Sequence, residues 1–151
     1  MIHLQIDERL PPPVETGPIQ RAAAAALAHR SDPDQVAVTI VVTGDDCIQS
    51  LNRQFMGIDA PTDVLAFPSG EIDPDLQMAY LGDVVISYPR AQAQSARGGH
   101  SLQQELELLT VHGILHLLGY DHATPEEKAR MWAVQTEILT VLENPLLPEG
   151  G

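Results

Sequence analysis

Residues Ser101 to His122 read SLQQELELLTVHGILHLLGYDH, and this stretch decides the fold. Ser101 and Gln104 have the spacing of a capping box, which predicts the start of a helix. Apolar residues occur on nearly every side of the segment that follows, so we expect this helix to lie at the centre of the molecule. It should run to Leu118, because Gly119 favours the left-handed conformation that ends a helix.

Four strands and four more helices are expected around this central helix. The expected strands are residues 2–6, 35–42, 62–67 and 81–88. The expected helices are residues 18–30, a helix that begins near residue 45, residues 89–97, and a last helix opened by a capping box at Thr124 and Glu127. Strands come mostly first and helices mostly last. This order predicts an α+β domain with a small mixed four-stranded sheet covered by about five helices.

Two local features of this scheme can be stated from the residue types. Asp45 or Asp46 is expected to cap the second helix. The apolar face of that helix would be formed by Ile48, Leu51 and Phe55. The segment 69–80 is polar and contains proline, so we expect an exposed loop there.

The composition indicates one domain. With 151 residues and 44% hydrophobic content, residues 1–144 are expected to form a single domain and residues 145–151 a disordered tail. Cys47 is the only cysteine and no charged-then-apolar leader opens the chain, which together predict a cytoplasmic location. The longest aliphatic runs are far shorter than the roughly 20 residues that a membrane span needs, so no membrane insertion is expected.

The charge balance is acidic. Eight basic residues stand against 21 acidic ones, and the net charge is −13. Such a balance disfavours non-specific attraction to nucleic acids, whose affinity depends largely on Lys and Arg at phosphates. A few arginines and a metal dication can still make one cleft positive on an acidic protein.

Three histidines near the end of the central helix have metal-ligand spacing. His112 and His116 are four residues apart, so their imidazoles leave the same helix face about 6 Å apart. Both can then reach one metal at roughly 2.1 Å. The turn at Gly119 can bring His122 back as a third ligand. Three nitrogen ligands with an open fourth position are typical of catalytic zinc, so we expect one Zn²⁺, or another divalent metal, on this helix and the turn after it.

The same spacing occurs in the metzincin proteases, H-E-x-x-H-x-x-G-x-x-H. Gly113 stands where those enzymes have their glutamate base. Peptide hydrolysis is therefore disfavoured unless another carboxylate, such as Asp121, reaches the metal-bound water. Otherwise Asp121 is expected to make the turn or to orient a ligand histidine.

The segment 112–122, HGILHLLGYDH, resembles the signature of the YbeY family of bacterial rRNA maturation factors. The similarity continues over roughly residues 36–142. It includes Leu51-Asn52, PTDVLAFP at 61–68, LGDVVIS at 81–87, and Met131 with EIL at 137–139. The family consists of metal-dependent, single-strand-specific endoribonucleases. The resemblance implies that the three histidines bind the metal, that RNA is the substrate, and that the protein acts on the 3′ end of small-subunit rRNA and in ribosome quality control. It also implies the small ribosomal subunit or an assembly GTPase as partners.

One departure from the family concerns RNA contact. The family usually has an arginine at the position of Met56. Arg53 lies three residues earlier on the same helix face, and its guanidinium either reaches the same phosphate or remains a solvated charge. Four other basic residues could border the site. They are Arg90, Arg97, Lys128 and Arg130.

The resulting hypothesis is phosphodiester hydrolysis, in which the metal lowers the pKa of a bound water to about 7 and polarises a phosphoryl oxygen. An alternative is a non-catalytic ribosome-assembly factor with a structural metal site, which Met56 and the acidic charge favour. A metzincin-like protease is the weaker third interpretation, because Gly113 removes the expected base.

Overall fold

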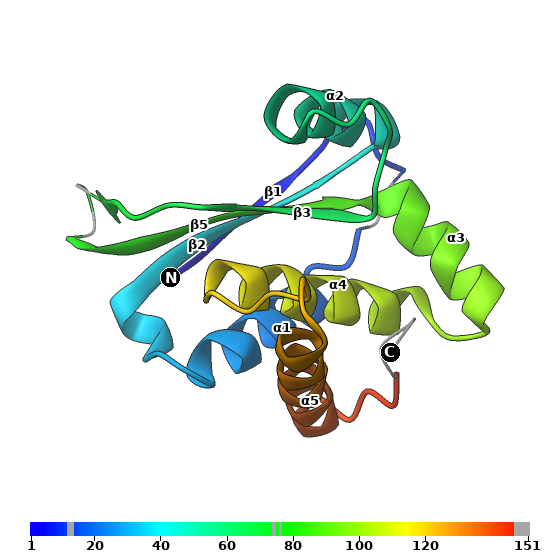
Figure 1. The fold of residues 1–151 in the computed structure, drawn as a ribbon. Helices are drawn as coiled ribbons and strands as arrows, with labels where there is room; N and C mark the ends of the chain where they lie inside the picture. The colour runs from blue at the N-terminus through cyan, green and yellow to red at the C-terminus, as the bar shows by residue number, and fades with distance from the viewer. Residues whose placement is uncertain (12–13, 74, 76, 147–151) are drawn as a thin grey trace.

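The computed structural model describes residues 1–11, 14–73, 75 and 77–146, and within these it contains one mixed sheet and five α-helices (Figure 1). The strands are β1 (Ile2–Ile6), β2 (Val36–Thr43), β3 (Val64–Pro68), β4 (Ile72–Asp73) and β5 (Met78–Ser87). The helices are α1 (Gly17–Ala28), α2 (Asp45–Met56), α3 (Tyr88–Gly98), α4 (Leu102–Leu117) and α5 (Pro125–Val141), with a short 3₁₀ turn at Pro33–Gln35. The expected α+β class is confirmed.

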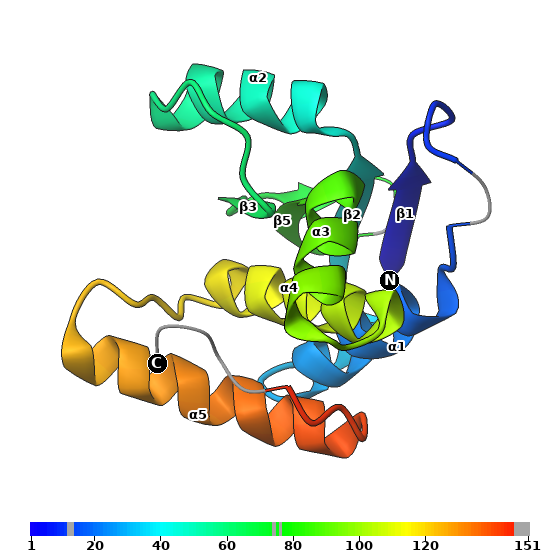
Figure 2. The same cartoon turned by 90° about the vertical axis from the view of Figure 1, so that its right-hand side faces the viewer.

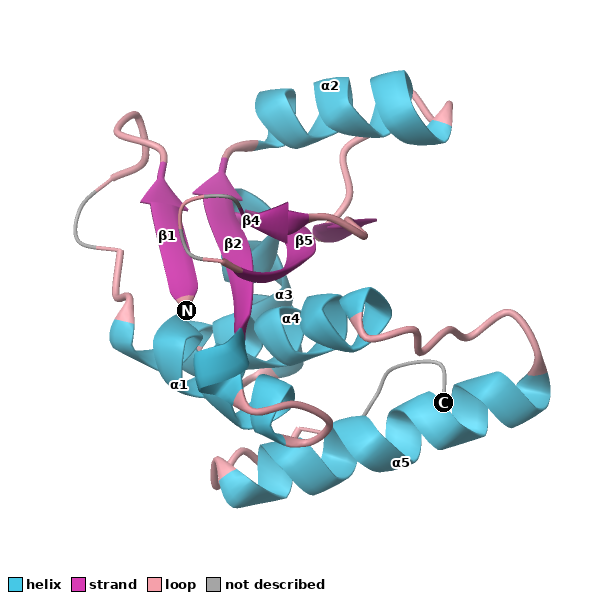
Figure 3. Ribbon diagram, turned by 90° about the vertical axis from the view of Figure 1, so that its left-hand side faces the viewer, coloured by secondary structure: helices cyan, strands magenta, loops and turns pink. Residues whose placement is uncertain are grey.

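The main path of the sheet has the order β1-β2-β5-β3. β1, β2 and β5 are parallel, and β3 runs antiparallel to β5. Parallel neighbours need crossover connections, and α1 supplies one between β1 and β2. Helices α1, α4 and α5 lie on one side of the sheet and α2 lies on the other (Figures 1 and 3). The four expected strands are confirmed.

The expectation of a loop over 69–80 is wrong in part. β4 pairs antiparallel with the beginning of β5, with Ile72 opposite Ala79. Tyr80 N–H also donates to the Glu71 carbonyl at 2.8 Å. The hydrogen bonds between β4 and β5 pair the backbone, but the strand buries little, because Ile72 stays 69% exposed. Such a strand lacks the alternation of apolar and polar residues by which strands are identified in a sequence.

The expected cap of α2 is also wrong. Gly44 occupies the N-cap and no side chain caps the helix. Asp45 instead lies inside the first turn, where its Oδ1 accepts a hydrogen bond of 2.7 Å from Ser87 Oγ at the end of β5. Along the helix, Ile48 is buried, but Phe55 is 59% exposed and makes only an edge contact with Phe67. Ile48 and Leu51 thus pack against the sheet, as expected, whereas Phe55 in the last turn of α2 does not join this buried cluster.

Helix α4 is central, as its sequence predicts. Its capping box forms, with Gln104 N–H donating to Ser101 Oγ at 3.0 Å and Ser101 N–H donating to Gln104 Oε1 at 3.1 Å. It lies between the sheet and α5 and contacts α1 and α3 at its sides (Figure 2). Because α4 is covered on nearly all sides, its apolar residues join one core with those of α1, β2, β5 and α5.

Gly113 allows α4 to lie close to the sheet. A Cβ atom at this position would stand 2.5 Å from Val84 Cγ1 of β5 and 3.3 Å from Val64 Cγ2 of β3. A larger residue would therefore force the Val84 side chain to move, since real carbon contacts are about 3.5–4.0 Å. The glycine thus fixes the depth at which the helix carries its histidines.

The C-terminal end of the chain packs onto α4 as far as Asn144. The Asn144 side chain is buried, and its Nδ2–H donates to the Gln104 carbonyl at 3.0 Å. Of the expected tail 145–151, residues 147–151 lie outside the described residues. In the part of the chain that the structure describes, no helix is long and apolar enough to cross a membrane.

Candidate metal centre

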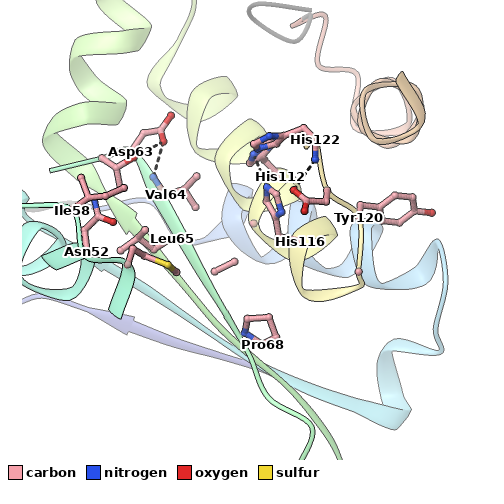
Figure 4. A pocket seen from close by; sticks show the side chains of 16 residues that line it. Asn52, Ile58, Asp63, Val64, Leu65, Pro68, His112, His116, Tyr120 and His122 are labelled. Atoms are coloured by element: carbon pink, nitrogen blue, oxygen red, sulfur yellow. Dashed lines mark hydrogen bonds between the residues drawn. The ribbon is translucent and has the colours of Figure 1, made fainter. Parts of the chain in front are cut away.

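His112, His116 and His122 converge on one point (Figure 4). One ligand nitrogen from each lies within 4.8 Å of the others. His112 and His116 follow from the helical repeat, and their Nε2 atoms are 3.2 Å apart. Two side chains from successive turns of α4 therefore present nitrogens to the same small volume.

The turn after α4 supplies His122. Gly119 has a φ of +99°, which a residue with a Cβ rarely adopts. The chain then folds back on the helix, with Tyr120 N–H donating to the Leu115 carbonyl at 3.0 Å. The ring of His122 comes to rest 5.1 Å from that of His116 and 5.9 Å from that of His112, centre to centre. The helix stop predicted at Gly119 is what brings the third imidazole to the other two.

The nitrogen set fits a tetrahedral metal ion. Two imidazole nitrogens at roughly 2.1 Å from a tetrahedral zinc stand about 3.4 Å apart. The Nε2 atoms of His112 and His116 are 3.2 Å apart, close to that value. His122 is the exposed member of the group, and its ligand nitrogen lies within 4.8 Å of the other two.

Two of the three imidazoles are held in the form that binds metals. Burial lowers the pKa of His112, against a smaller opposing effect of its hydrogen bond to Gln135. Burial also lowers the pKa of His116 from its ordinary 6.5 to about 4, assisted by the nearby His112 and His122. Both rings are therefore neutral at neutral pH, with lone pairs available to a cation.

Two residues of α5 complete the surroundings of the histidines. Gln135 Oε1 lies 2.9 Å from His112 Nδ1. The Trp132 ring lies 5.6 Å from the ring of His112 and 5.7 Å from that of His122, centre to centre. Sequence reasoning missed both. A signal existed for Gln135, because it is a polar residue four positions after Met131 on the apolar side of α5.

The histidines lie in a cleft of about 800 Å³. One wall is α4 with the turn after it, and the opposite wall is the end of α2, the segment that follows it and β3 (Figure 4). Asn52 holds the second wall together, since its buried amide donates to the Ala60 carbonyl at 2.9 Å. Asn52 of the Leu51-Asn52 pair thus has a structural role beside the cleft.

The opposite wall of the cleft carries an acidic and an apolar part. Asp63 lines it, with Oδ1 accepting from Val64 N–H at 2.8 Å and Oδ2 from Gln94 Nε2 at 3.3 Å. Met56 and Ile58 also line it and are about half exposed. Among the described residues that line the cleft there is no Lys or Arg.

The basic residues considered for RNA contact lie outside this cleft. Arg53 is 62% exposed, and its Nη1 stands 3.9 Å from Asp59 Oδ1. Arg90 Nε lies 3.5 Å from Asp45 Oδ1, and Lys128 lies over the Trp132 ring. Arg130 borders a different hollow beside Tyr120. The arginine cluster that could have made the cleft positive does not line it in the described part of the chain.

Asp121 contacts the ligand turn directly. Its Oδ1 accepts a 2.7 Å hydrogen bond from the backbone N–H of His122. Its charge also raises the pKa of His116, as a smaller effect opposed to burial. This contact is of the turn-making kind expected for Asp121, and it fixes the backbone that carries the third imidazole.

The chain is similar to known proteins over most of its length. The profile of the family described as "Endoribonuclease YbeY" matches residues 14–143. A protein named Endoribonuclease YbeY from Chloroflexus aurantiacus is 49% identical over 95% of this chain and 96% of its own length. A protein of the same name from Geobacillus kaustophilus is 45% identical over 80% of this chain and 82% of its own length.

A solved structure also has the same fold. The solution structure of TM1509 from Thermotoga maritima superposes with a TM-score of 0.56 at 23% identity, covering 100% of this chain and 99% of the other. At that identity the likeness concerns the fold alone. From the family profile and the extent of the sequence identity, the chain belongs to the endoribonuclease YbeY family.

Proposed function

We propose that this protein is a metal-dependent endoribonuclease that cleaves single-stranded RNA. The observation that carries the proposal is the convergence of three imidazoles on one point inside a cleft. Three nitrogen ligands leave a fourth position open to the substrate. At about 800 Å³ the cleft has room for a nucleotide and its flanking phosphates.

In this proposal His112, His116 and His122 hold one divalent metal, and zinc is the ion that best suits three imidazoles. When bound, the ion supplies Lewis acidity toward water and toward a phosphoryl oxygen. Asp121 keeps the His122 backbone in place. Asp63 and Asp121 make the cleft lining acidic, so the metal provides the positive charge that an RNA phosphate needs there.

The cellular role that we propose is maturation of the small-subunit rRNA 3′ end and ribosome quality control, in the cytoplasm. Membership in the YbeY family supports it, since relatives 44–49% identical carry the name endoribonuclease. The small ribosomal subunit or an assembly GTPase would be the partner.

A cleavage assay tests the enzymatic proposal. Purified full-length protein loaded with zinc should cut a labelled single-stranded oligoribonucleotide and leave the matching duplex intact. A chelator should stop the cleavage, and added zinc should restore it, because the histidines alone provide no Lewis acid. A zinc-loaded protein that cuts no RNA but still binds ribosomal subunits would instead support the assembly-factor alternative.

Arg53 is proposed to contact an RNA phosphate at the rim, outside the metal cleft. Arg53→Ala should raise KM a few-fold with little change in kcat, because the side chain is exposed and outside the cleft lining. Losing one phosphate contact should also reduce the slope of log affinity against log salt by about 0.7, the value for single strands. Arg90→Ala, which also removes an exposed cation from an ion pair, is the matched control. An unchanged salt slope would leave Arg53 as a solvated charge.

A further inference from the structure

Gln135 is a polar residue in an apolar layer. It lies on α5, is 2% exposed, and has the fully buried Met131 and Leu139 one turn away on either side. Burying an amide without a hydrogen-bond partner is costly. A buried glutamine at such a position therefore points to a specific partner, and that partner is His112.

The bond between these two residues determines where the imidazole carries its proton. Gln135 Oε1 stands 2.9 Å from His112 Nδ1. A carbonyl oxygen can only accept, so Nδ1 must carry the hydrogen, and Nε2 of the neutral ring is then left with its lone pair. Nε2 is the atom that faces His116, at 3.2 Å. The hydrogen bond thus directs the lone pair of His112 into the centre of the histidine cluster.

The opposite orientation of the amide is incompatible with a ligand at this place. If the NH₂ group faced Nδ1, Nδ1 would have to accept, and the hydrogen of the neutral ring would lie on Nε2. A protonated Nε2 cannot bind a metal ion. His116 obtains a backbone hydrogen bond with Tyr120, which no side-chain replacement removes. His112 depends on a side chain.

We infer that Gln135 is a positioning residue that holds His112 in the tautomer with a free Nε2 and thereby sets the metal affinity of the site. The inference rests on the proposed metal site. Metal-binding histidines usually donate their second N–H to a carboxylate or a backbone carbonyl. Here a neutral amide takes that place, so the hydrogen bond orients the ring without adding a negative charge beside it.

The choice of variant depends on a small cavity beside this hydrogen bond. The cavity has a volume of about 160 Å³ and is lined by His112, Trp132 and Gln135 together with Asp63 and Gln94. In Gln135→Ala a water molecule could enter from it and replace the lost oxygen. Gln135→Leu fills the space with an apolar side chain that has no acceptor oxygen. Gln135→Met does the same with a side chain that is unbranched, like that of glutamine.

The first measurement is the tautomer of His112 in the metal-free full-length protein, from the ¹⁵N shifts of the imidazole ring. Wild type and Gln135→Glu, which keeps an acceptor oxygen, should show the hydrogen on Nδ1. Gln135→Leu should shift it largely to Nε2. Thr110→Val is the matched control, because it removes the 2.7 Å hydrogen bond from Thr110 Oγ1 to the Leu106 carbonyl, a buried polar group of the same helix. It should leave the tautomer unchanged.

The second measurement is zinc affinity by competition with a chromogenic chelator. Gln135→Leu should bind zinc about 10–100-fold more weakly than wild type, the usual effect of losing such a partner. Gln135→Glu and Thr110→Val should stay within a few-fold of wild type. If Gln135→Leu does not fold, as judged by circular dichroism, Gln135→Met takes its place and should give the same loss.

Two results would overturn the inference. One is a variant without an acceptor at residue 135 that keeps both the wild-type tautomer and the wild-type affinity. The other is an equal loss of affinity in Thr110→Val, which would mean that any loss of buried polar contacts weakens the site. A wild-type protein that binds no zinc would instead contradict the proposed function. The tautomer measurement needs no metal and keeps the two failures apart.

Discussion

His112→Ala is expected to remove bound zinc and RNA cleavage together. The substitution leaves two nitrogens for the ion, and it leaves Gln135 with a buried oxygen and no partner. A metal ion contributes several kcal/mol to stabilising charge in the transition state. Since each 1.36 kcal/mol corresponds to a tenfold change in rate, cleavage should fall by about three orders of magnitude or more.

The measurement needs both metal content and rate. Zinc per chain, determined by atomic absorption after dialysis, should fall from near one to near zero, and single-stranded RNA should remain uncut. His29→Ala is the matched control, because His29 is an exposed histidine at the end of α1, remote in sequence from the site. The control should keep both properties. Cleavage that survives in His112→Ala without zinc would reject the metal-dependent mechanism.

The features that the sequence predicts correctly are those determined over a few residues. The capping box at Ser101 and Gln104, the four-residue spacing of His112 and His116, and the stop at Gly119 each depend on neighbouring residues along α4. Helix geometry converts such spacings directly into distances. For that reason the convergence of the histidines could be anticipated without a structure.

The features that it misses depend on contacts between distant segments. Gln135 contacts His112, which lies 23 residues away in the sequence. Asp45, expected to cap α2, instead accepts a hydrogen bond from Ser87, which lies 42 residues away. The apolar side of α5 marks Gln135 as a buried position, but nothing in the nearby sequence identifies His112 as its partner or Ser87 as the partner of Asp45. The charge of the cleft could not be predicted from the sequence for the same reason. It depends on where the side chains of Arg53 on α2 and Arg90 on α3 lie in the folded protein.

The apolar part of the cleft has a consequence for substrate contact. Met56 and Ile58 present half-exposed apolar side chains to the metal cleft, and Phe55 beside them is largely exposed. Unpaired bases can pack on such side chains, whereas a duplex keeps its bases stacked inside. The wall opposite the histidines therefore suits the unpaired bases of the single-stranded RNA in the proposed function better than it suits a duplex.

Gly113→Glu is expected to destabilise the fold strongly and to produce no peptidase. The position carries the general base in metzincins, so this variant restores their motif in full. Here, however, the first side-chain atom would already meet Val84 Cγ1 at 2.5 Å, between α4 and the sheet. Overpacking and a carboxylate forced against two valines should together cost about 4 kcal/mol or more. The gain in helix propensity over glycine is only about 1 kcal/mol.

Urea denaturation gives the loss of stability, and Gly113→Ala provides a graded comparison. The single methyl group should cost about 1–3 kcal/mol through overpacking alone. Gln103→Glu, which adds the same carboxylate to an exposed position of α4, should be close to neutral. If Gly113→Glu instead folded with wild-type stability and cut peptides when loaded with zinc, the carboxylate would have to reach the metal. That result would mean that only the missing base at residue 113 separates this site from a protease. The contact with Val84 argues against it, because α4 lies too close to the sheet to leave room for a side chain at this position.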